Sequence, residues 1–212
     1  MLSGDLQRVW SPTDLLDLVP SHRNPTGEVF EYADTNYLLL GLMIEHVRGR
    51  PIHEVLRDGV LDIDGIERLI YQPGEIPTQP MAMPDSGSTA ILEEGGGFLP
   101  SLAHVTSDGP GAAMASDAPS LARWWRAFCS GEIISKASLT EMSTYHDEYG
   151  LGLLNMSDPY AVGFVHLGSH DGYLSWAGCL PESGAVVVVL TNQVFDDISG
   201  MAQPLVEALA SG

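Results

Sequence analysis

The chain has 212 residues, of which 28 are acidic and nine are basic, so its formal net charge at neutral pH is −19. That charge disfavours nucleic acid and an anionic membrane surface as partners, because both are negatively charged. A hydrophobic content of 44% is enough to form a core, which excludes a globally disordered chain. No apolar run reaches the length of a membrane helix.

Neither a targeting signal nor a cysteine motif is evident. The stretch from Met1 to Asp5 lacks the basic and apolar regions of a signal peptide. We therefore expect a cytoplasmic protein if the chain is complete, and leave the localisation unknown if it is a fragment. Cys129 and Cys179 fit no zinc or redox spacing, so we expect either two buried small side chains or one disulfide between them.

Helix signals come first along the chain. Residues 11–19 predict a short helix capped by a serine, with proline at its first position and an aspartate at its third. The apolar residues between positions 35 and 48 predict a longer helix that is buried on most sides and ends at Gly49. Further helices are predicted at about 51–56, 117–130, 135–142 and 197–209.

Strand signals gather near the C-terminus. Three successive strands are predicted at 160–167, 172–180 and 185–191, the last two joined as an antiparallel hairpin, and a further strand is weighed at 149–154. Residues 71–110 predict a long irregular stretch, in which Glu93 and Glu94 are interpreted as solvated charges rather than cleft residues. We expect one incomplete domain over residues 1–212, with a helical, loop-rich part at about 10–145 and the sheet with its final helix at about 146–212.

Tyr32 is the first candidate for chemistry. It lies just before the predicted helix at 35–48, and a phenol can shuttle protons if a nearby cation lowers its pKa. The same residues also fit a half-buried tyrosine beside a helix-capping Asp34 or Thr35.

The second candidate is the stretch His166-Leu167-Gly168-Ser169. Alternation along a strand places His166 and Gly168 on one face, where a ligand can lie against the glycine backbone, and the N–H of Ser169 can act as an oxyanion donor. An ordinary hairpin with a surface histidine is the alternative. His166, His170 and Asp171 could also be metal ligands, but the His-x3-His spacing suits a helix, so neither a metal nor a cofactor is expected.

Four stretches follow one another in a recognisable order: residues 1–4, residues 32–41 beginning Tyr32-Ala33-Asp34, residues 111–117, and His166-Leu167-Gly168-Ser169. As a set they resemble the serine β-lactamase and D-Ala-D-Ala carboxypeptidase superfamily, in the class C-like branch that also holds esterases and D-amino-acid peptidases. Residues 32–41 are similar to its Tyr-x-Asn box with the helix that follows. His166 and Gly168 are similar to the His-x-Gly form of its Lys-Thr-Gly box.

The resemblance implies an α/β (α+β) fold in which helices flank an antiparallel sheet, and acyl transfer at the amide or ester of a small molecule. It implies that Tyr32 shuttles protons, that His166 forms a positive or hydrogen-bonding edge, and that the Ser169 N–H supplies half of an oxyanion hole. Asp34 and Gly168 would contact the substrate. Asp34 stands where the family usually has Asn, and a carboxylate there cannot donate hydrogen bonds and disfavours a substrate carboxylate.

The family's nucleophile is missing from these residues. Lys136 is the single lysine of the chain, the residue three positions before it is Ile133, and no Ser-x-x-Lys motif exists. The resemblance therefore implies that the nucleophile helix, the N-terminal helix and the first strands of the sheet are absent. Losing the nucleophile removes nearly all of the chemical step, so we expect this chain alone to be inactive.

The same gap should expose the strand at 185–191, which in the family's sheet order lies beside the missing first strand. A long apolar edge strand promotes aggregation, so we expect a second polypeptide, a second copy or a rearranged terminus to cover it. Two functions stay open: a truncated serine hydrolase, and a non-catalytic relative that acts as a binding or interaction module.

Overall fold

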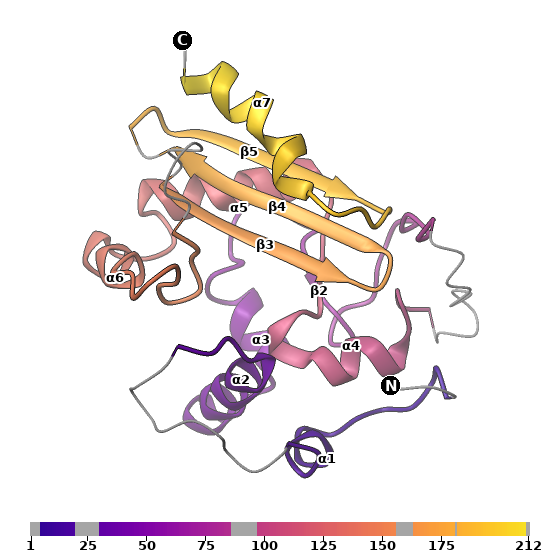
Figure 1. Ribbon diagram of the computed structural model, residues 1–212. Helices are drawn as coiled ribbons and strands as arrows, with labels where there is room; N and C mark the ends of the chain where they lie inside the picture. The colour runs from indigo at the N-terminus through magenta and orange to yellow at the C-terminus, as the bar shows by residue number, and fades with distance from the viewer. Residues whose placement is uncertain (1–4, 20–29, 86–96, 156–162, 181, 211–212) are drawn as a thin grey trace. The chain divides into compact units, whose positions relative to one another are not determined.

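The structure is a computed structural model that describes residues 5–19, 30–85, 97–155, 163–180 and 182–210 (Figure 1). The chain forms two compact units, and each is described by itself. The first unit holds most of residues 1–59, 70–83 and 87–115. Its elements are α1 (Pro12–Leu16), α2 (Asp34–Arg48), α3 (Ile52–Arg57), β1 (Ile70–Tyr71), α4 (Leu102–Asp108), the 3-10 turn η1 (Gly109–Gly111) and β2 (Met114–Ala115).

Local sequence signals set the start of α1 and the end of α2 as predicted, whereas α1 ends at Leu16, before the predicted residue 19. At α1 the Ser11 hydroxyl accepts from the Asp14 N–H at 3.2 Å, while the Asp14 carboxylate accepts from the Ser11 N–H at 3.1 Å, which completes a capping box. Helix α2 ends at Gly49, whose φ of 65° is the left-handed conformation that glycine adopts without strain.

The prediction that α2 is buried on most sides is wrong for the described residues. Its inward face buries Leu38 and Gly41, and Gly41 lies so close to Pro110 of η1 that a β-carbon there would collide with the proline ring. The opposite face leaves large apolar side chains in solvent, where Val47 is 78% exposed. The exposed members of this outward α2 stripe are Leu39, Leu40, Met43, Ile44 and Val47.

Helix α4 lies inside the stretch predicted to be irregular. Ser101 caps it by accepting from the His104 N–H at 3.2 Å, and Ala103 and Val105 are almost fully buried. Val105 belongs to the core cluster of the first unit, together with Ile52 of α3 and Tyr71 of β1. Strands β1 and β2 pair antiparallel beside this cluster.

The second unit contains the sheet. It is antiparallel with the order β3-β4-β5, and β5 has the predicted bounds. Isolated bridges at His146, Tyr149 and Leu154 take the place of the strand considered at 149–154. The elements are α5 (Ala118–Ser130), α6 (Lys136–Met142), β3 (Phe164–His170), β4 (Tyr173–Leu180), β5 (Ala185–Thr191) and α7 (Ile198–Ala210).

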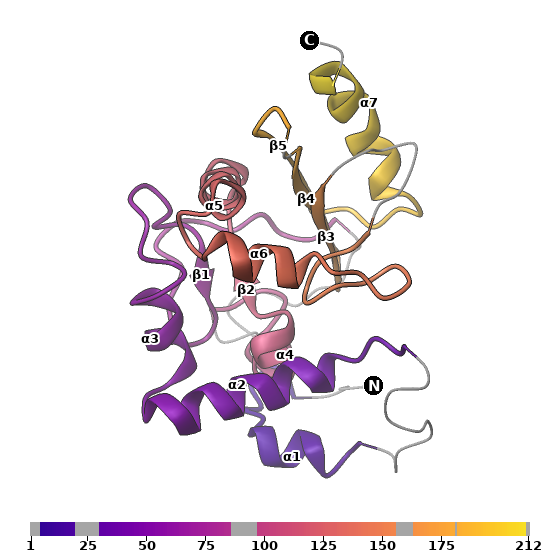
Figure 2. The ribbon, with the colours of Figure 1, turned by 90° about the vertical axis from the view of Figure 1, so that its left-hand side faces the viewer.

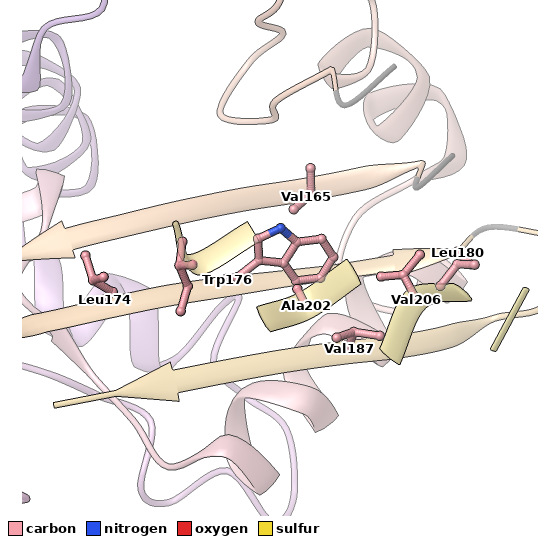
Figure 3. Packing of buried hydrophobic residues seen from close by; sticks show 8 residues of the cluster. Val165, Leu174, Trp176, Leu180, Val187, Ala202 and Val206 are labelled. Carbon is pink, nitrogen blue, oxygen red and sulfur yellow. The ribbon is translucent and has the colours of Figure 1, made fainter. Parts of the chain in front are cut away.

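Helices cover both faces of this sheet. Figure 2 shows α5 on one side of β4 and β5 and α7 on the other, and both helices contact these strands. On the α7 side, Trp176 is completely buried among Val165, Val187 and the α7 residues Ala202 and Val206 (Figure 3). Strand β5 consequently carries apolar residues on both faces: Val187 packs toward α7, and its neighbours Val186 and Val188 pack toward α5.

A disulfide joins Cys129 of α5 to Cys179 of β4, the second of the two possibilities left open by the sequence. It ties the α5-side core, which contains Trp125 and Phe128, to the central strand of the sheet. None of the helices in the described part of the chain is long and apolar enough to cross a bilayer.

Candidate functional site

Tyr32 and Asp34 stand at the start of α2 in the first unit. Ala33 between them is extended and serves as the N-cap residue, so neither Asp34 nor Thr35 is the cap. Tyr32 is 46% exposed, and its ring lies 5.8 Å from the Tyr37 ring, centroid to centroid. The sequence thus places a phenol directly before the helix, at the surface of its unit.

The surroundings of Tyr32 hold its proton in place. Burial raises its pKa to about 12, and the Asp34 charge, Tyr37 and a hydrogen bond with the Asp34 side chain act in the same direction. No basic side chain is among these causes in the described structure. At neutral pH Tyr32 is therefore a proton donor, and it needs a cation beside it before it can accept a proton readily.

The segment that begins at Gly111 lies against the start of α2. A β-carbon placed on Gly111 would stand 3.7 Å from the side chains of both Asp34 and Tyr37, which is ordinary van der Waals contact. Asp34 and Leu38 of α2 also line an open hollow of about 290 Å³, together with Leu15 of α1 and Asp108 of α4. Two of the four stretches noted in the sequence are thus neighbours in the first unit.

His166 and Gly168 lie on one face of β3 in the second unit, as alternation predicts. Val165 packs toward α7, whereas Ala177, which pairs with His166 across the strands, packs toward α5. His166 and Gly168 therefore face the α5 side of the sheet. Ser169 is exposed and pairs with Leu174 near the end of the strand.

Two residues that the sequence did not single out complete this face. The Tyr149 hydroxyl lies 2.9 Å from Nε2 of His166, and the two rings meet edge-on with centroids 6.0 Å apart. Ser175 pairs with Gly168, and its hydroxyl occupies the space that a β-carbon at 168 would need. A polar residue opposite a glycine in the predicted strands is the signal that could have indicated Ser175.

Burial lowers the pKa of His166, and a backbone hydrogen bond with Leu167 opposes this only in part. The imidazole is thus biased toward its neutral form near pH 7. The metal alternative gains no support, because the described residues contain no group of three His, Cys, Asp or Glu that could hold an ion. Residues 1–4, Glu93 and Glu94 lie outside the described residues.

Comparison with known proteins identifies the family. The model of the Beta-lactamase family matches residues 12–210. The chain belongs to the beta-lactamase family. Its mixed α/β architecture, with an antiparallel sheet between helices, is that of this family's solved members.

Three solved structures illustrate the likeness within the beta-lactamase family. D-amino acid amidase from Ochrobactrum anthropi SV3, in complex with D-phenylalanine, is 22% identical with a TM-score of 0.75, and the match covers 97% of this chain and 70% of the amidase. The octameric penicillin-binding protein homologue from Pyrococcus abyssi is 24% identical with a TM-score of 0.75, covering 95% of this chain and 48% of the homologue. A penicillin binding protein from Bacillus halodurans is 20% identical with a TM-score of 0.71, covering 98% and 65%. These chains share the fold and are longer than the region they have in common with residues 1–212.

Proposed function

We propose that residues 1–212 form the larger part of a serine hydrolase that transfers acyl groups from amides or esters. Its serine and lysine would come from a segment outside these residues. The observation that carries this proposal is a family match over residues 12–210 in a chain without a Ser-x-x-Lys motif. The proposed catalytic residues are Tyr32, His166 and Ser169, and the proposed substrate-binding residues are Asp34 and Gly168.

In the proposed reaction a serine oxygen attacks the substrate carbonyl, the amine or alcohol leaves with a proton, and water then hydrolyses the acyl-serine. Tyr32, with a pKa of about 12, keeps its proton and is suited to protonating the leaving group. A lysine brought beside it by the proposed segment would lower that pKa, so that Tyr32 could ionise and its phenolate could accept the serine proton. The N–H of Ser169 would donate to the carbonyl oxygen as negative charge develops there.

The substrate that fits best is the amide of a D-amino acid. The Asp34 carboxylate repels a substrate carboxylate and attracts an ammonium group, and an amino acid amide carries an ammonium group and no carboxylate. The similarity to a D-amino acid amidase supports the same choice. Esters, D-amino-acid peptides and β-lactams are the further candidate substrates.

The proposed segment would bind to both units. In the first unit, the outward α2 stripe suits an amphipathic helix, since a helix that is apolar on all sides is normally buried. In the second unit, β5 has no strand on its outer edge among the described residues, although both its faces are apolar and covered by helices. We propose that a second polypeptide segment adds to this edge, with a second copy of the chain as the alternative occupant.

A non-catalytic role is the second candidate. Asp34, at the position where the family usually has Asn, and the absence of a Ser-x-x-Lys motif from residues 1–212 favour it. In that case the chain would keep a ligand-binding or protein-interaction surface without turnover.

The experiment that separates the two candidates assays the native gene product with D-phenylalanine amide, its L-enantiomer, a small ester and a penicillin. Hydrolysis that a fluorophosphonate abolishes supports the hydrolase. A native product that begins at Met1 and turns over none of these compounds supports the binding module instead.

Coverage of β5 is measured separately, by hydrogen exchange. With a bound segment, the outward-directed amides of 185–191 are slowed as strongly as the inward ones. A monomer of the native product whose outward amides exchange at the rate of an open strand would contradict the proposed cover.

A further inference from the structure

Tyr149 is held rigidly beside His166 by the backbone around it. Residues 146–154 form a tight loop in which the Tyr149 N–H donates to the His146 carbonyl at 3.2 Å. The Leu154 N–H then donates to the Val165 carbonyl at 2.9 Å, which fixes the end of the loop to β3 one residue before His166. The Tyr149 side chain is buried, so its hydroxyl meets the imidazole from a defined direction.

The hydrogen bond with Tyr149 indicates which nitrogen carries the proton. Nε2 faces the Tyr149 hydroxyl at 2.9 Å. A phenol O–H is a stronger donor than a neutral imidazole N–H, and a bare imidazole nitrogen is a stronger acceptor than a phenol oxygen, so the favoured arrangement has the phenol as donor. A neutral ring with its proton on Nδ1 has a bare Nε2, and a bare Nε2 accepts from the phenol.

We propose that Tyr149 is a positioning residue that donates its O–H to Nε2 of His166 and fixes the imidazole as the neutral Nδ1–H tautomer. Nε2 is then engaged within the protein. His166 contributes a fixed, uncharged edge to this face of β3 instead of a positive charge for a substrate carboxylate.

The functional consequence of an uncharged His166 rests on the proposed hydrolase. In that enzyme a neutral imidazole reinforces the preference for an acyl group without a carboxylate. The hydrogen bond itself is a property of the chain and is tested without any turnover.

The test is long-range ¹H–¹⁵N NMR of histidine-labelled protein at neutral pH, with the seven histidines assigned by single substitutions. In the wild-type chain we expect the ¹⁵N chemical shift of Nε2 of His166 to be that of an unprotonated ring nitrogen. We expect the ¹⁵N chemical shift of Nδ1 to be that of a protonated one. Tyr149→Phe keeps the ring and its packing and removes the O–H. It should move the Nε2 signal toward the protonated position as the tautomers mix.

Tyr145→Phe is the matched control. Its hydroxyl donates to the Gly163 carbonyl at 2.9 Å, so it also loses a part-buried tyrosine hydrogen bond, and it should leave both His166 shifts unchanged. Equal shifts in the two variants, or no shift in Tyr149→Phe, would overturn the proposal. A wild-type Nε2 signal at the protonated position would overturn it without any variant. Loss of hydrolysis in the native product would contradict the proposed function and leave the tautomer result intact.

Discussion

Replacing Asp34 with Asn should make Tyr32 a stronger acid. The pKa of Tyr32 is raised from 10.0 to about 12, with burial as the largest cause and the Asp34 charge as the second. Asp34→Asn leaves burial and Tyr37 in place, removes the charge, and turns an acceptor-only group into one that can also donate. The pKa of Tyr32 should therefore fall below about 12 and remain above 10.0.

The ionised fraction shows the size of the effect. At pH 11 a phenol with a pKa of about 12 is about one-tenth ionised, and a fall of about one unit would bring it to about one-half. A pH titration of protein labelled with ¹³C at the tyrosine Cζ follows each of the seven tyrosines, and Tyr32→Phe assigns the signal.

Glu31→Gln is the control for this titration. It removes an equal charge one residue before Tyr32, but Glu31 is not among the causes of the raised pKa, so the Tyr32 curve should stay in place. Equal shifts of the titration curve in Asp34→Asn and Glu31→Gln, or an unchanged curve in Asp34→Asn, would contradict the role of the Asp34 charge.

Three further predictions concern stability, each measured by denaturant unfolding. The disulfide between Cys129 and Cys179 joins residues that are 50 positions apart and so restricts the unfolded chain. Replacing both cysteines with Ser should therefore lower the free energy of unfolding by about 4 kcal/mol. A loss below about 1 kcal/mol would show that the disulfide does not restrict the unfolded chain in this way. Trp176→Ala empties the centre of the α7-side core and should cost about 3–5 kcal/mol, while an unchanged midpoint would show that the site is not packed as described. Gly168→Ala should cost about 1–3 kcal/mol because the new methyl meets the Ser175 hydroxyl, and adding Ser175→Ala should recover most of it; purely additive losses would argue against that contact.

The sequence predicted the elements whose signals are local. Strand β5 is an uninterrupted apolar run bounded by turn residues, and both its ends lie where the pattern places them. The start of α7 was predicted in the same way, since Asp197 accepts from the Gly200 N–H at 2.9 Å. Helix α4 was missed because it is seven residues long and lies among glycines and prolines, where length and periodicity give too little signal.

Local sequence patterns could not predict features that depend on residues far apart in the chain. The hydrogen bond from Tyr149 to His166 joins positions 17 apart, and the disulfide joins positions 50 apart, so each requires the fold before it can be inferred. The prediction that α2 is buried on most sides was wrong for a different reason. Its composition matches a helix covered all round, while the described residues cover one face.

The site residues of the two units stay predictions, because the sequence motifs identify the residue types and not the substrate. Tyr32 and Asp34 are defined within the first unit, and His166, Gly168, Tyr149 and Ser175 within the second. Family resemblance is what connects the two sets, and an assay of the native gene product tests that connection.

The most direct measurement is therefore to map the serine that reacts in the native product. The product is isolated intact from its source, treated with a fluorophosphonate, digested, and analysed by peptide mass spectrometry. We expect one modified serine, in a Ser-x-x-Lys motif outside residues 1–212, and no modification of the 212-residue chain alone. A modified serine within residues 1–212, or a native product that reacts nowhere, would contradict it.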